Sequence, residues 1–326
     1  MVINSNIIQN NPIVCISMLT YNHEKYIEQA IKSVIMQKTQ YKYCLVIGED
    51  ASTDNTRKIV LEYAKTYPDK IIAILHDYNV GMVENVYAIR KFLVGKYIAI
   101  LEGDDYWTDE YKLEKQISFL EKHPEYYAVA HNHYEVDETG RLIKGLKLSE
   151  YMSSYSRKKI YDLQELEKYY LPGHSSTLIY RNFLKELSSL QIEVYNKCKA
   201  IGDRKLSVIL ANMGLTYKMD EYMSAYRHCS SAWTQGNFVG GLAYNGYLNI
   251  NLLQDMSYEM FGNELDFHYG KMRSWYGTFL AFVKKPNKSN FVAVIRILEE
   301  GNVLQKILFL VKHTIDYPIR KRRKYE

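Results

Sequence analysis

The chain has 326 residues, of which 47% are hydrophobic and 24% charged, a composition that excludes a predominantly disordered protein. Its net charge of +5 arises from 42 lysines and arginines against 37 aspartates and glutamates. Such a balance suits an anionic partner but gives no indication of a nucleic-acid-binding protein. The length is that of one large domain, or of one domain with an appendage.

Short apolar runs alternate with helical patterns over the first hundred residues. Strands of about five residues separated by helices of ten or more indicate βαβ units and a parallel sheet. The predicted strands are 13–19, 43–47, 71–75 and 97–101, and the predicted helices between them are 22–38, 56–67 and 85–93.

The alternation changes after Asp105. A mainly helical pattern begins near residue 240, and we therefore predict a first domain over 1–235 and a C-terminal helical region over 236–326. Between Asp105 and that boundary the predicted helices are 112–122, 163–170, 182–190 and 204–212, and the predicted strands are 126–136 (antiparallel), 178–180, 216–219 and 222–227.

Polar residues follow each of the first four predicted strands. Ligands of an open parallel sheet gather beyond the carboxyl ends of its strands, so these residues are candidates for a binding site. Two acidic groups at neighbouring strand ends would repel each other unless a cation intervened, and a divalent ion completed by phosphate oxygens is the simplest solution. No glycine-rich dinucleotide motif or P-loop is present. The candidate groups are Thr20-Tyr21-Asn22, Glu49-Asp50 with Ser52 and Asp54, Asn79 to Gly81, and Glu102-Gly103-Asp104-Asp105.

Three of these segments carry a resemblance to a known family. In their order and spacing, residues 16–22, 46–54 and 102–105 resemble family 2 glycosyltransferases of the GT-A fold. The similarity extends more loosely through Trp233, where Gly202-Asp203 and Tyr226-Arg227-His228 resemble later motifs of the family. It implies an α/β fold with a Rossmann-like, nucleotide-sugar-binding sheet covered by helices on both faces, followed by the C-terminal helical region.

The resemblance also implies roles for individual residues. Asp50 would accept a hydrogen bond from the base, which favours uracil because its N3–H is a donor. Asp104 would bind Mn²⁺ or Mg²⁺, with His228 as a weaker candidate ligand, and Glu102 would lie near the ribose. Asp203 would be the general base of an inverting displacement. The implied nucleotide-sugar-binding residues are Thr20, Tyr21, Asn22, Glu24, Asp50, Asn79, Glu102, Gly103 and Asp104.

The sequence departs from the family pattern at four positions. Ala51 replaces the usual glycine, an exchange that we expect to be mild if the backbone there avoids a positive φ. Glu102 replaces the first aspartate of the D-x-D motif. Gly202 stands in place of an acidic residue before the base, and Glu84 in place of an arginine before Asn85.

Several of these residues have a structural alternative. Asp54 is expected to cap the next helix rather than to bind a ligand, and Asp203 can cap a helix as well as act as a base. His228 can equally be a structural histidine. His131 and His133 share one face of a strand but lack partners at ligand spacing. A hydrolase triad that includes His174 is disfavoured because no nucleophile elbow is present.

The predicted reaction is transfer of a sugar from a nucleotide diphosphate carrier, with UDP favoured, to a hydroxyl of a glycan or lipid-linked acceptor. A nucleotide-sugar-binding protein without catalytic activity remains an alternative, and it would tolerate the loss of Asp203. A sugar-phosphate nucleotidyltransferase would need a glycine-rich basic loop after the first strand, and residues 20–25 contain no glycine.

The sequence also bears on location. Four cysteines without a C-x-x-C pair indicate a reducing compartment, and no signal peptide or span of about 18 apolar residues is evident. We expect a cytoplasmic protein, either soluble or peripheral on the inner face of the cell membrane. The apolar stripe of Leu304, Ile307, Leu308, Val311 and Ile315 and the basic run Arg320–Lys324 are typical of a membrane-surface helix, or of a helix packed on its own domain.

Overall fold

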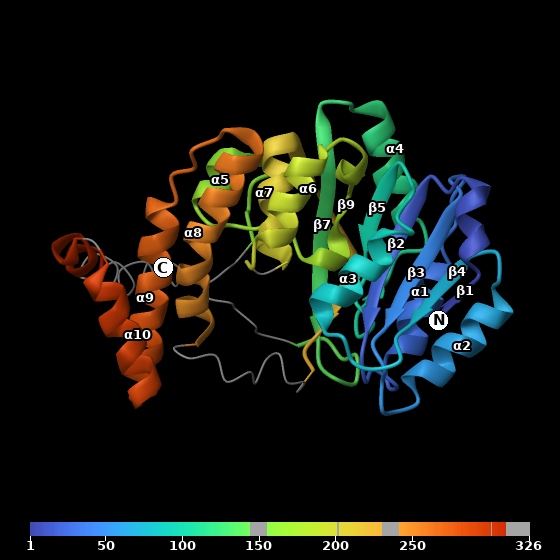
Figure 1. The fold of residues 1–326 in the computed structure, drawn as a ribbon, viewed down its shortest axis with the longest axis horizontal. Coiled ribbons are helices and arrows are strands. Elements are labelled where there is room, and N and C mark those ends of the chain that lie inside the picture. Colours follow the sequence, from blue (N-terminus) through green and yellow to red (C-terminus); the bar gives the residue numbers. More distant parts are fainter. Residues whose placement is uncertain (144–154, 201, 230–240, 301, 311–326) are drawn as a thin grey trace, which may run out of the picture. The chain divides into compact units, whose positions relative to one another are not determined.

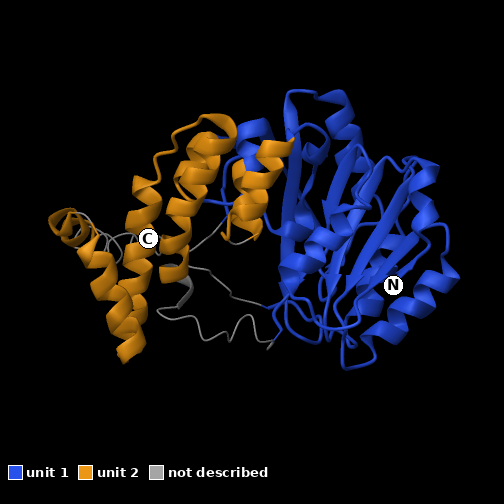
Figure 2. Ribbon diagram, viewed as in Figure 1, with its two compact units in different colours: residues 1–162, 170–188, 209–230 blue, residues 163–169, 189–208, 231–326 orange. Residues whose placement is uncertain are grey.

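The computed structural model describes residues 1–143, 155–200, 202–229, 241–300 and 302–310. The chain divides into two compact units (Figure 2). The first, here called the sheet unit, comprises residues 1–162, 170–188 and 209–230. The second, the helical unit, comprises residues 163–169, 189–208 and 231–326.

The sheet unit is built on one mixed sheet, in which the described residues form ten strands. The order across the sheet is β1-β4-β3-β2-β5-β9-β7-β10-β6, with β8 paired to β10, and Figure 1 shows the strands from β1 to β7 side by side. The strands are β1 (Val2–Ile3), β2 (Val14–Thr20), β3 (Tyr43–Glu49), β4 (Ile71–Leu75), β5 (Tyr97–Ile100), β6 (Tyr106–Trp107), β7 (Tyr126–Val136), β8 (Ile160–Tyr161), β9 (Ile179–Arg181) and β10 (Leu215–Arg227).

The predicted parallel sheet is confirmed by β4, β3, β2 and β5, which run in the same direction. The chain passes from β2 outward through β3 to β4, and then returns to place β5 on the other side of β2. The strand order therefore reverses between β2 and β5, and a crevice opens outside the carboxyl ends of two strands at such a reversal. Thr20 ends β2, and the acidic segment 102–105 follows β5.

Helices cover both faces of this half of the sheet. Helices α1 (Ile27–Ile35), α2 (Thr56–Thr66) and α4 (Lys112–Lys122) share one buried apolar core with alternate residues of the strands. Helix α3 (Met82–Arg90) lies against the other face, where a Cβ added at Gly48 would lie 2.1 Å from Asn85 Oδ1. Each large apolar side chain buried in this way contributes roughly 1.5–3 kcal/mol to the stability of the fold.

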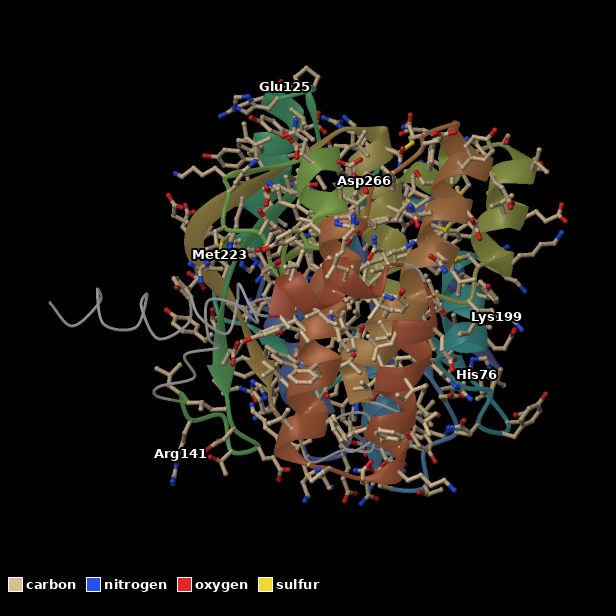
Figure 3. All side chains as sticks on the ribbon, turned by 90° about the vertical axis from the view of Figure 1, so that its left-hand side faces the viewer. His76, Glu125, Arg141, Lys199, Met223 and Asp266 are labelled. Atoms are coloured by element: carbon tan, nitrogen blue, oxygen red, sulfur yellow. The ribbon has the colours of Figure 1, made fainter. Side chains whose placement is uncertain are left out.

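The other half of the sheet contains β7 and β10, which are parallel to each other, and β9, which is antiparallel to both β5 and β7. The prediction of two strands over 216–219 and 222–227 is wrong in one respect, because β10 is a single strand. Its register shifts between Lys218 and Tyr222 and again before Ser224, so the polar residues there form a bulge within the strand. Met223, labelled in Figure 3, lies at the second of these shifts and is fully buried.

Several predicted helices have other bounds in the structure, and 22–38 and 182–190 differ most. Residues 22–26 precede α1, because their backbone bonds to the loop after β3 instead of continuing a helix. The predicted helix 182–190 is wrong. The segment instead forms a 3₁₀ turn, Phe183–Lys185, after Asn182, whose Oδ1 accepts a hydrogen bond from Leu184 N–H. Helix α6 (Ser189–Lys197) begins only after that turn.

The helical unit contains α5 (Leu163–Glu167), α6, α8 (Gly241–Phe261), α9 (His268–Lys284) and α10 (Lys288–Glu299), while α7 (Gly202–Met213) has residues in both units. Tyr169 links the early segment to the C-terminal helices, since its hydroxyl donates to the Gly246 carbonyl at 3.0 Å and its ring meets Phe267 edge-on. Two segments that precede residue 235 thus belong to this unit, and the domain boundary near 235 stays a prediction. No helix among the described residues is long and apolar enough to cross a bilayer.

Candidate functional site

The loops after β2 and β3 are tied together by backbone and side-chain hydrogen bonds. Asp50 N–H donates to the Thr20 carbonyl at 3.1 Å. Asn22 has a positive φ of 55°; its N–H donates to Ser52 Oγ at 3.0 Å, and its Oδ1 accepts from Thr53 N–H at 2.8 Å. Asn22 therefore fixes the shape of the loop that carries the exposed ring of Tyr21.

Glu24 and Asp54 continue this connection toward α2. Glu24 N–H donates to Asp54 Oδ2 at 3.0 Å, and Glu24 Oε2 accepts from Asn55 N–H at the same distance. Asp54 Oδ1 also accepts from Thr56 N–H at 2.9 Å, so its carboxylate satisfies the first N–H of α2, as predicted, although Asn55 occupies the N-cap position itself. The Glu24 carboxylate is thus engaged in the loop, and its contact with a nucleotide sugar stays a prediction.

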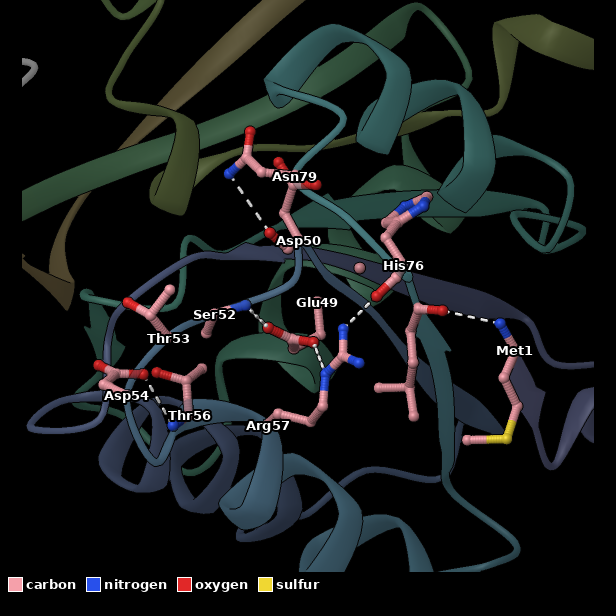
Figure 4. Close-up of polar contacts among 12 residues, drawn as sticks. Met1, Glu49, Asp50, Ser52, Thr53, Asp54, Thr56, Arg57, His76 and Asn79 are labelled. Atoms are coloured by element: carbon pink, nitrogen blue, oxygen red, sulfur yellow. Dashed lines mark hydrogen bonds and ion pairs between the residues drawn. The ribbon is translucent and has the colours of Figure 1, made fainter.

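Of the two acidic residues after β3, Glu49 has a structural role. Its side chain is fully buried, where Oε1 accepts from Ser52 N–H at 2.6 Å and Oε2 accepts from Arg57. The Arg57 guanidinium also donates to the His76 carbonyl, as Figure 4 shows. A buried carboxylate is stable only when it is paired and hydrogen-bonded, and both conditions are met.

Asp50 holds the loop after β4 in place. Its side chain is 4% exposed, with Oδ1 accepting from Val80 N–H at 2.7 Å and Oδ2 from Gly81 N–H at 3.0 Å. Asn79 Nδ2 donates to the Asp50 carbonyl at 3.3 Å (Figure 4). Each carboxylate oxygen can accept more than one hydrogen bond, so Asp50 keeps acceptor capacity for a base.

Ala51 differs from the sequence-based expectation. Its φ is 56°, in the left-handed region, whereas a mild exchange for glycine required the backbone to avoid positive φ. A side chain in this region costs roughly 1–2 kcal/mol for a residue other than glycine. The backbone between Asp50 and Ser52 is therefore strained.

The acidic segment after β5 meets the end of β2 at Gly103. Gly103 N–H donates to the Leu19 carbonyl at 2.9 Å, and a Cβ at this position would lie 2.8 Å from both Thr20 Oγ1 and His23 Nδ1. Within the described part of the chain, these two buried atoms have no hydrogen-bond partner. Buried polar atoms are rarely left unpaired, so this pair fits the donor or acceptor groups of a ligand.

His23 was not among the residues predicted from sequence. Its Nε2 lies 3.9 Å from Asp104 Oδ2, and both side chains are about one-fifth exposed, at 21% and 22%. Burial lowers the pKa of His23, while the carboxylates of Asp104 and Asp54 oppose that change. Its position directly after Thr20-Tyr21-Asn22 is the one sequence signal that could have identified it.

Asp105 and Arg227 fix the backbone of this acidic segment through hydrogen bonds. Asp105 is buried and its Oδ1 accepts from Arg227 N–H at 2.9 Å, while Arg227 Nε donates to the Asp104 carbonyl at 2.8 Å. Burial and the neighbouring Asp104 carboxylate raise the pKa of Asp105 well above its usual range. Arg227 and Asp105 thus hold the backbone of this segment in place, while the Asp104 side chain stays partly exposed to solvent.

The residues around Asp104 fit a weakly ligated hard cation better than a closed metal cage. No three of the His, Cys, Asp and Glu side chains in the described ranges are grouped so that they could hold a metal together. Mg²⁺ and similar ions are usually held by one or two carboxylates, with substrate phosphates and water completing the shell. Asp104, with Glu102 two residues before it, provides carboxylates of that kind.

His228 and Asp203 were predicted as a metal ligand and as the base. His228 Nε2 is 3.0 Å from Glu135 Oε2, so its ring already has a partner, and its role as a metal ligand stays a prediction. Asp203 is exposed on the first turn of α7 and belongs to the helical unit, whereas the other predicted site residues belong to the sheet unit. Its role as a base also stays a prediction.

Comparison with known sequences gives a family match. The model of the family described as glycosyl transferase family 2 matches residues 15–187. An uncharacterized protein of Mycobacterium tuberculosis is 42% identical over 107 residues, which is 33% of this chain and 31% of that protein. The Escherichia coli UDP-Glc:alpha-D-GlcNAc-diphosphoundecaprenol beta-1,3-glucosyltransferase WfgD is 36% identical over 110 residues, or 34% of this chain and 42% of WfgD. The matched region thus spans less than half the length of either curated relative.

Comparison with solved structures shows the fold. TarS 1-349 of S. aureus, crystallised with UDP-GlcNAc, has a TM-score of 0.63 at 16% identity, covering 87% of this chain and 79% of TarS. The mannosyltransferase PcManGT of Pyrobaculum calidifontis, in complex with GDP-Man and Mn²⁺, has a TM-score of 0.52 at 14% identity, covering 97% and 83%. The predicted GT-A fold with C-terminal helices is therefore confirmed.

Proposed function

This chain belongs to glycosyl transferase family 2. We propose that it transfers a sugar from a nucleotide diphosphate carrier to a hydroxyl group of an acceptor. One observation carries the proposal. Thr20 Oγ1 and His23 Nδ1 are buried and unpaired in the described part of the sheet unit, and both adjoin Gly103, the residue that precedes Asp104. They stand where the strand order reverses, and a sheet of this kind binds its ligand there.

The proposed donor is a UDP-sugar. Asp50 is fixed by Val80 and Gly81, and its remaining lone pairs suit the N3–H donor of uracil. Two relatives support this carrier by name: WfgD uses UDP-Glc, and TarS was crystallised with UDP-GlcNAc. PcManGT binds GDP-Man instead, so the carrier has to be tested directly.

Asp104 is the proposed ligand of Mn²⁺ or Mg²⁺. When bound, such an ion neutralises charge on the departing diphosphate. The chain's own contribution is to hold the Asp104 carboxylate at the tip of the segment, through the bond from Arg227 to the Asp104 carbonyl and the bond from Gly103 to Leu19. The Mn²⁺ in the PcManGT complex supports this assignment for the fold.

Asp203 is the proposed general base. It would take the proton from the acceptor hydroxyl as that oxygen attacks the anomeric carbon, and a single displacement of this kind inverts the configuration. It stands on the first turn of α7, and desolvation raises the pKa of its carboxyl group above the usual range, which is the direction that suits a proton acceptor. The acceptor class is a glycan or a lipid-linked sugar of cell-surface polysaccharide, which the acceptor in the name of WfgD supports.

The C-terminal helix is proposed to touch the membrane surface at the inner face of the cell membrane. Leu304, Ile307 and Leu308 are exposed by 64%, 46% and 58%, although Lys306 between them is buried. Val311, Ile315 and the basic run Arg320–Lys324 lie outside the described residues. Sedimentation with anionic and with neutral vesicles tests this contact, and equal recovery with both would contradict it.

The central experiment is calorimetry of UDP-sugars and GDP-sugars with and without Mn²⁺, followed by an assay of donor hydrolysis. We expect metal-dependent binding of a UDP-sugar and slow hydrolysis with water as acceptor. Asp203→Asn should abolish hydrolysis and leave donor binding unchanged. Hydrolysis that persists in this variant would refute the base assignment, and binding without any turnover by the unmodified protein would favour a nucleotide-sugar-binding protein that is not an enzyme.

A further inference from the structure

The sheet unit contains a pocket that none of the loops described above lines. It has a volume of about 190 Å³ and lies where the middle of β7 meets the bulge of β10 and residues 155–157. The side chains that matter for its chemistry are His133, Glu135, Tyr155, Arg157, Lys218 and Tyr222.

Two basic side chains, Lys218 and Arg157, line the pocket. Burial lowers the pKa of Lys218, the Asp220 carboxylate outside the pocket opposes this change, and the charge of Arg157 adds to it. Among the described residues, Lys218 forms no ion pair, and its Nζ donates one long hydrogen bond of 3.4 Å to the Ser156 carbonyl. A half-buried ammonium group in this state gains stability from an anion placed beside it.

The remaining lining does not supply that anion. Glu135 lines the pocket but is engaged by His228, whose Nε2 lies 3.0 Å from Glu135 Oε2. Burial, with the charges of Lys218 and His228, lowers the pKa of His133 to about 4, so His133 is neutral near pH 7. Tyr155 and Tyr222 add aromatic rings, which commonly pack on the apolar faces of ligands.

A short chain of side chains connects the pocket to the acidic segment after β5. The rings of His133 and His174 are 5.3 Å apart, and His174 Nδ1 lies 3.7 Å from Asp105 Oδ2. Asp105 is the neighbour of Asp104, the proposed metal ligand. Because β7 runs parallel to β10 and in the same direction as β5, the carboxyl-terminal half of β7 lies at the same edge of the sheet as Asp104.

From this arrangement we propose that the pocket is an acceptor subsite that holds the anionic group of an acidic saccharide, with Lys218 and Arg157 as its specificity-determining residues. The inference rests on the proposed glycosyltransferase function. The shared chemistry of the ligand is a carboxylate or a phosphate carried on a sugar ring, as in a uronic acid or a sugar phosphate.

The test compares binding of glucuronic acid, glucose 6-phosphate and uncharged glucose to the full chain, measured by NMR titration in the presence of saturating UDP. The variant Lys218→Met keeps the apolar stem of the side chain and removes its charge. The matched control is Lys159→Met, because Lys159 is exposed, pairs with Asp220 outside the pocket and directly precedes β8, the strand that pairs with β10.

We expect at least one acidic sugar to bind the unmodified protein about tenfold or more tightly than glucose, since a hydrogen bond to a charged group is among the stronger ones. Lys218→Met should lose this preference, while Lys159→Met keeps it. Both variants should bind the UDP-sugar and hydrolyse it as the unmodified protein does. The relative affinities of glucuronic acid and glucose 6-phosphate then tell whether the natural group is a carboxylate or a phosphate.

Three results would overturn the subsite: no preference for an acidic sugar, a preference that survives Lys218→Met, or a preference lost equally in the control. None of them affects donor hydrolysis. Conversely, a protein that binds acidic sugars through Lys218 but never turns over a nucleotide sugar would retain the pocket and refute the proposed function. The two failures are therefore distinguishable.

Discussion

Gly103 lies at the closest approach between the acidic segment and the end of β2. A Cβ there would lie 2.8 Å from Thr20 Oγ1 and from His23 Nδ1, closer than side-chain atoms tolerate. We expect Gly103→Ala to push these residues apart, to lower the free energy of unfolding by about 1–3 kcal/mol, and to weaken donor binding more than the stability loss alone explains. Urea unfolding and calorimetry measure the two effects.

Gly246→Ala is the control for a glycine replacement without a clash. Its added Cβ would meet no atom closer than 3.5 Å, and a helical alanine is favoured over glycine by roughly 0.5–1 kcal/mol. This variant should be as stable as the parent or more so, with donor affinity unchanged. Equal donor affinity in Gly103→Ala and Gly246→Ala would remove Gly103 from the site.

Ala51 offers a test of backbone strain at the neighbouring strand end. Replacement by glycine removes the cost of a side chain at φ 56°, about 1–2 kcal/mol, against a larger entropy of the unfolded chain of about 0.5–1 kcal/mol. Ala51→Gly should therefore raise the free energy of unfolding by up to about 1.5 kcal/mol. Ala88→Gly, within α3, should lower it by a similar amount. A loss of stability in Ala51→Gly would show that the left-handed backbone carries no strain.

At the scale of single elements, the sequence predicted best where burial is continuous. The strands β3 and β4 are runs of apolar residues long enough to be buried in the sheet. The strand 71–75, the alternating strand 126–136 and the helix 112–122 were predicted to the residue. The two-residue strands β6 and β8 carry no pattern of their own. They exist because β10 offers them a partner, and such pairing at a distance leaves no periodic signal.

Most residues of the candidate site could be predicted from the sequence, but the hydrogen bonds and close contacts between them could not. Strand-end position sufficed to select Thr20, Asp50 and Asp104, since a parallel sheet collects its carboxyl ends at one edge. It could not reveal that Asn22 takes a positive φ, or that His23 lies under Gly103. Both depend on how two loops distant in sequence meet, which tertiary contacts decide.

Helix α4 begins with a buried lysine whose titration should affect the stability of the fold. Lys112 is fully buried; its Nζ donates to Gln116 Oε1 at 2.7 Å and lies 4.3 Å from the centre of the Trp107 ring. Burial lowers its pKa well below the usual 10.5 of a lysine, and Asp109 opposes this only in part. Between the lowered pKa and 10.5, the unfolded chain binds a proton that the folded chain does not.

Stability should therefore rise with pH in that window, by at most about 1.4 kcal/mol per pH unit from this group. Lys112→Met removes the group, so the difference in unfolding free energy between parent and variant should shift in favour of the parent from pH 7 to pH 10. Urea unfolding at several pH values gives this difference, in which other titrating groups cancel. A difference independent of pH would mean that Lys112 stays charged in the folded protein.

For the whole molecule, family and fold follow from the first hundred residues, but the division of the chain does not. The sequence places a boundary where continuous helical patterns begin, near residue 235. Chain order hides that 163–169 and 189–208 are grouped with the C-terminal helices, because a unit assembled from separate segments has no single boundary in the sequence.

A chain ended at residue 235 tests which division governs folding. It would lack α8 and α9, and with them the Gly246 carbonyl that accepts from Tyr169 and the Met260 carbonyl that accepts from Gln191 at 2.7 Å. The apolar surfaces of 163–169 and 189–208 would then meet water, each large side chain at a cost of roughly 1.5–3 kcal/mol. We expect this fragment to melt at a lower temperature than the full chain and to aggregate, by thermal unfolding and light scattering. A monomeric fragment with the same melting temperature would instead establish 1–235 as a domain that folds alone.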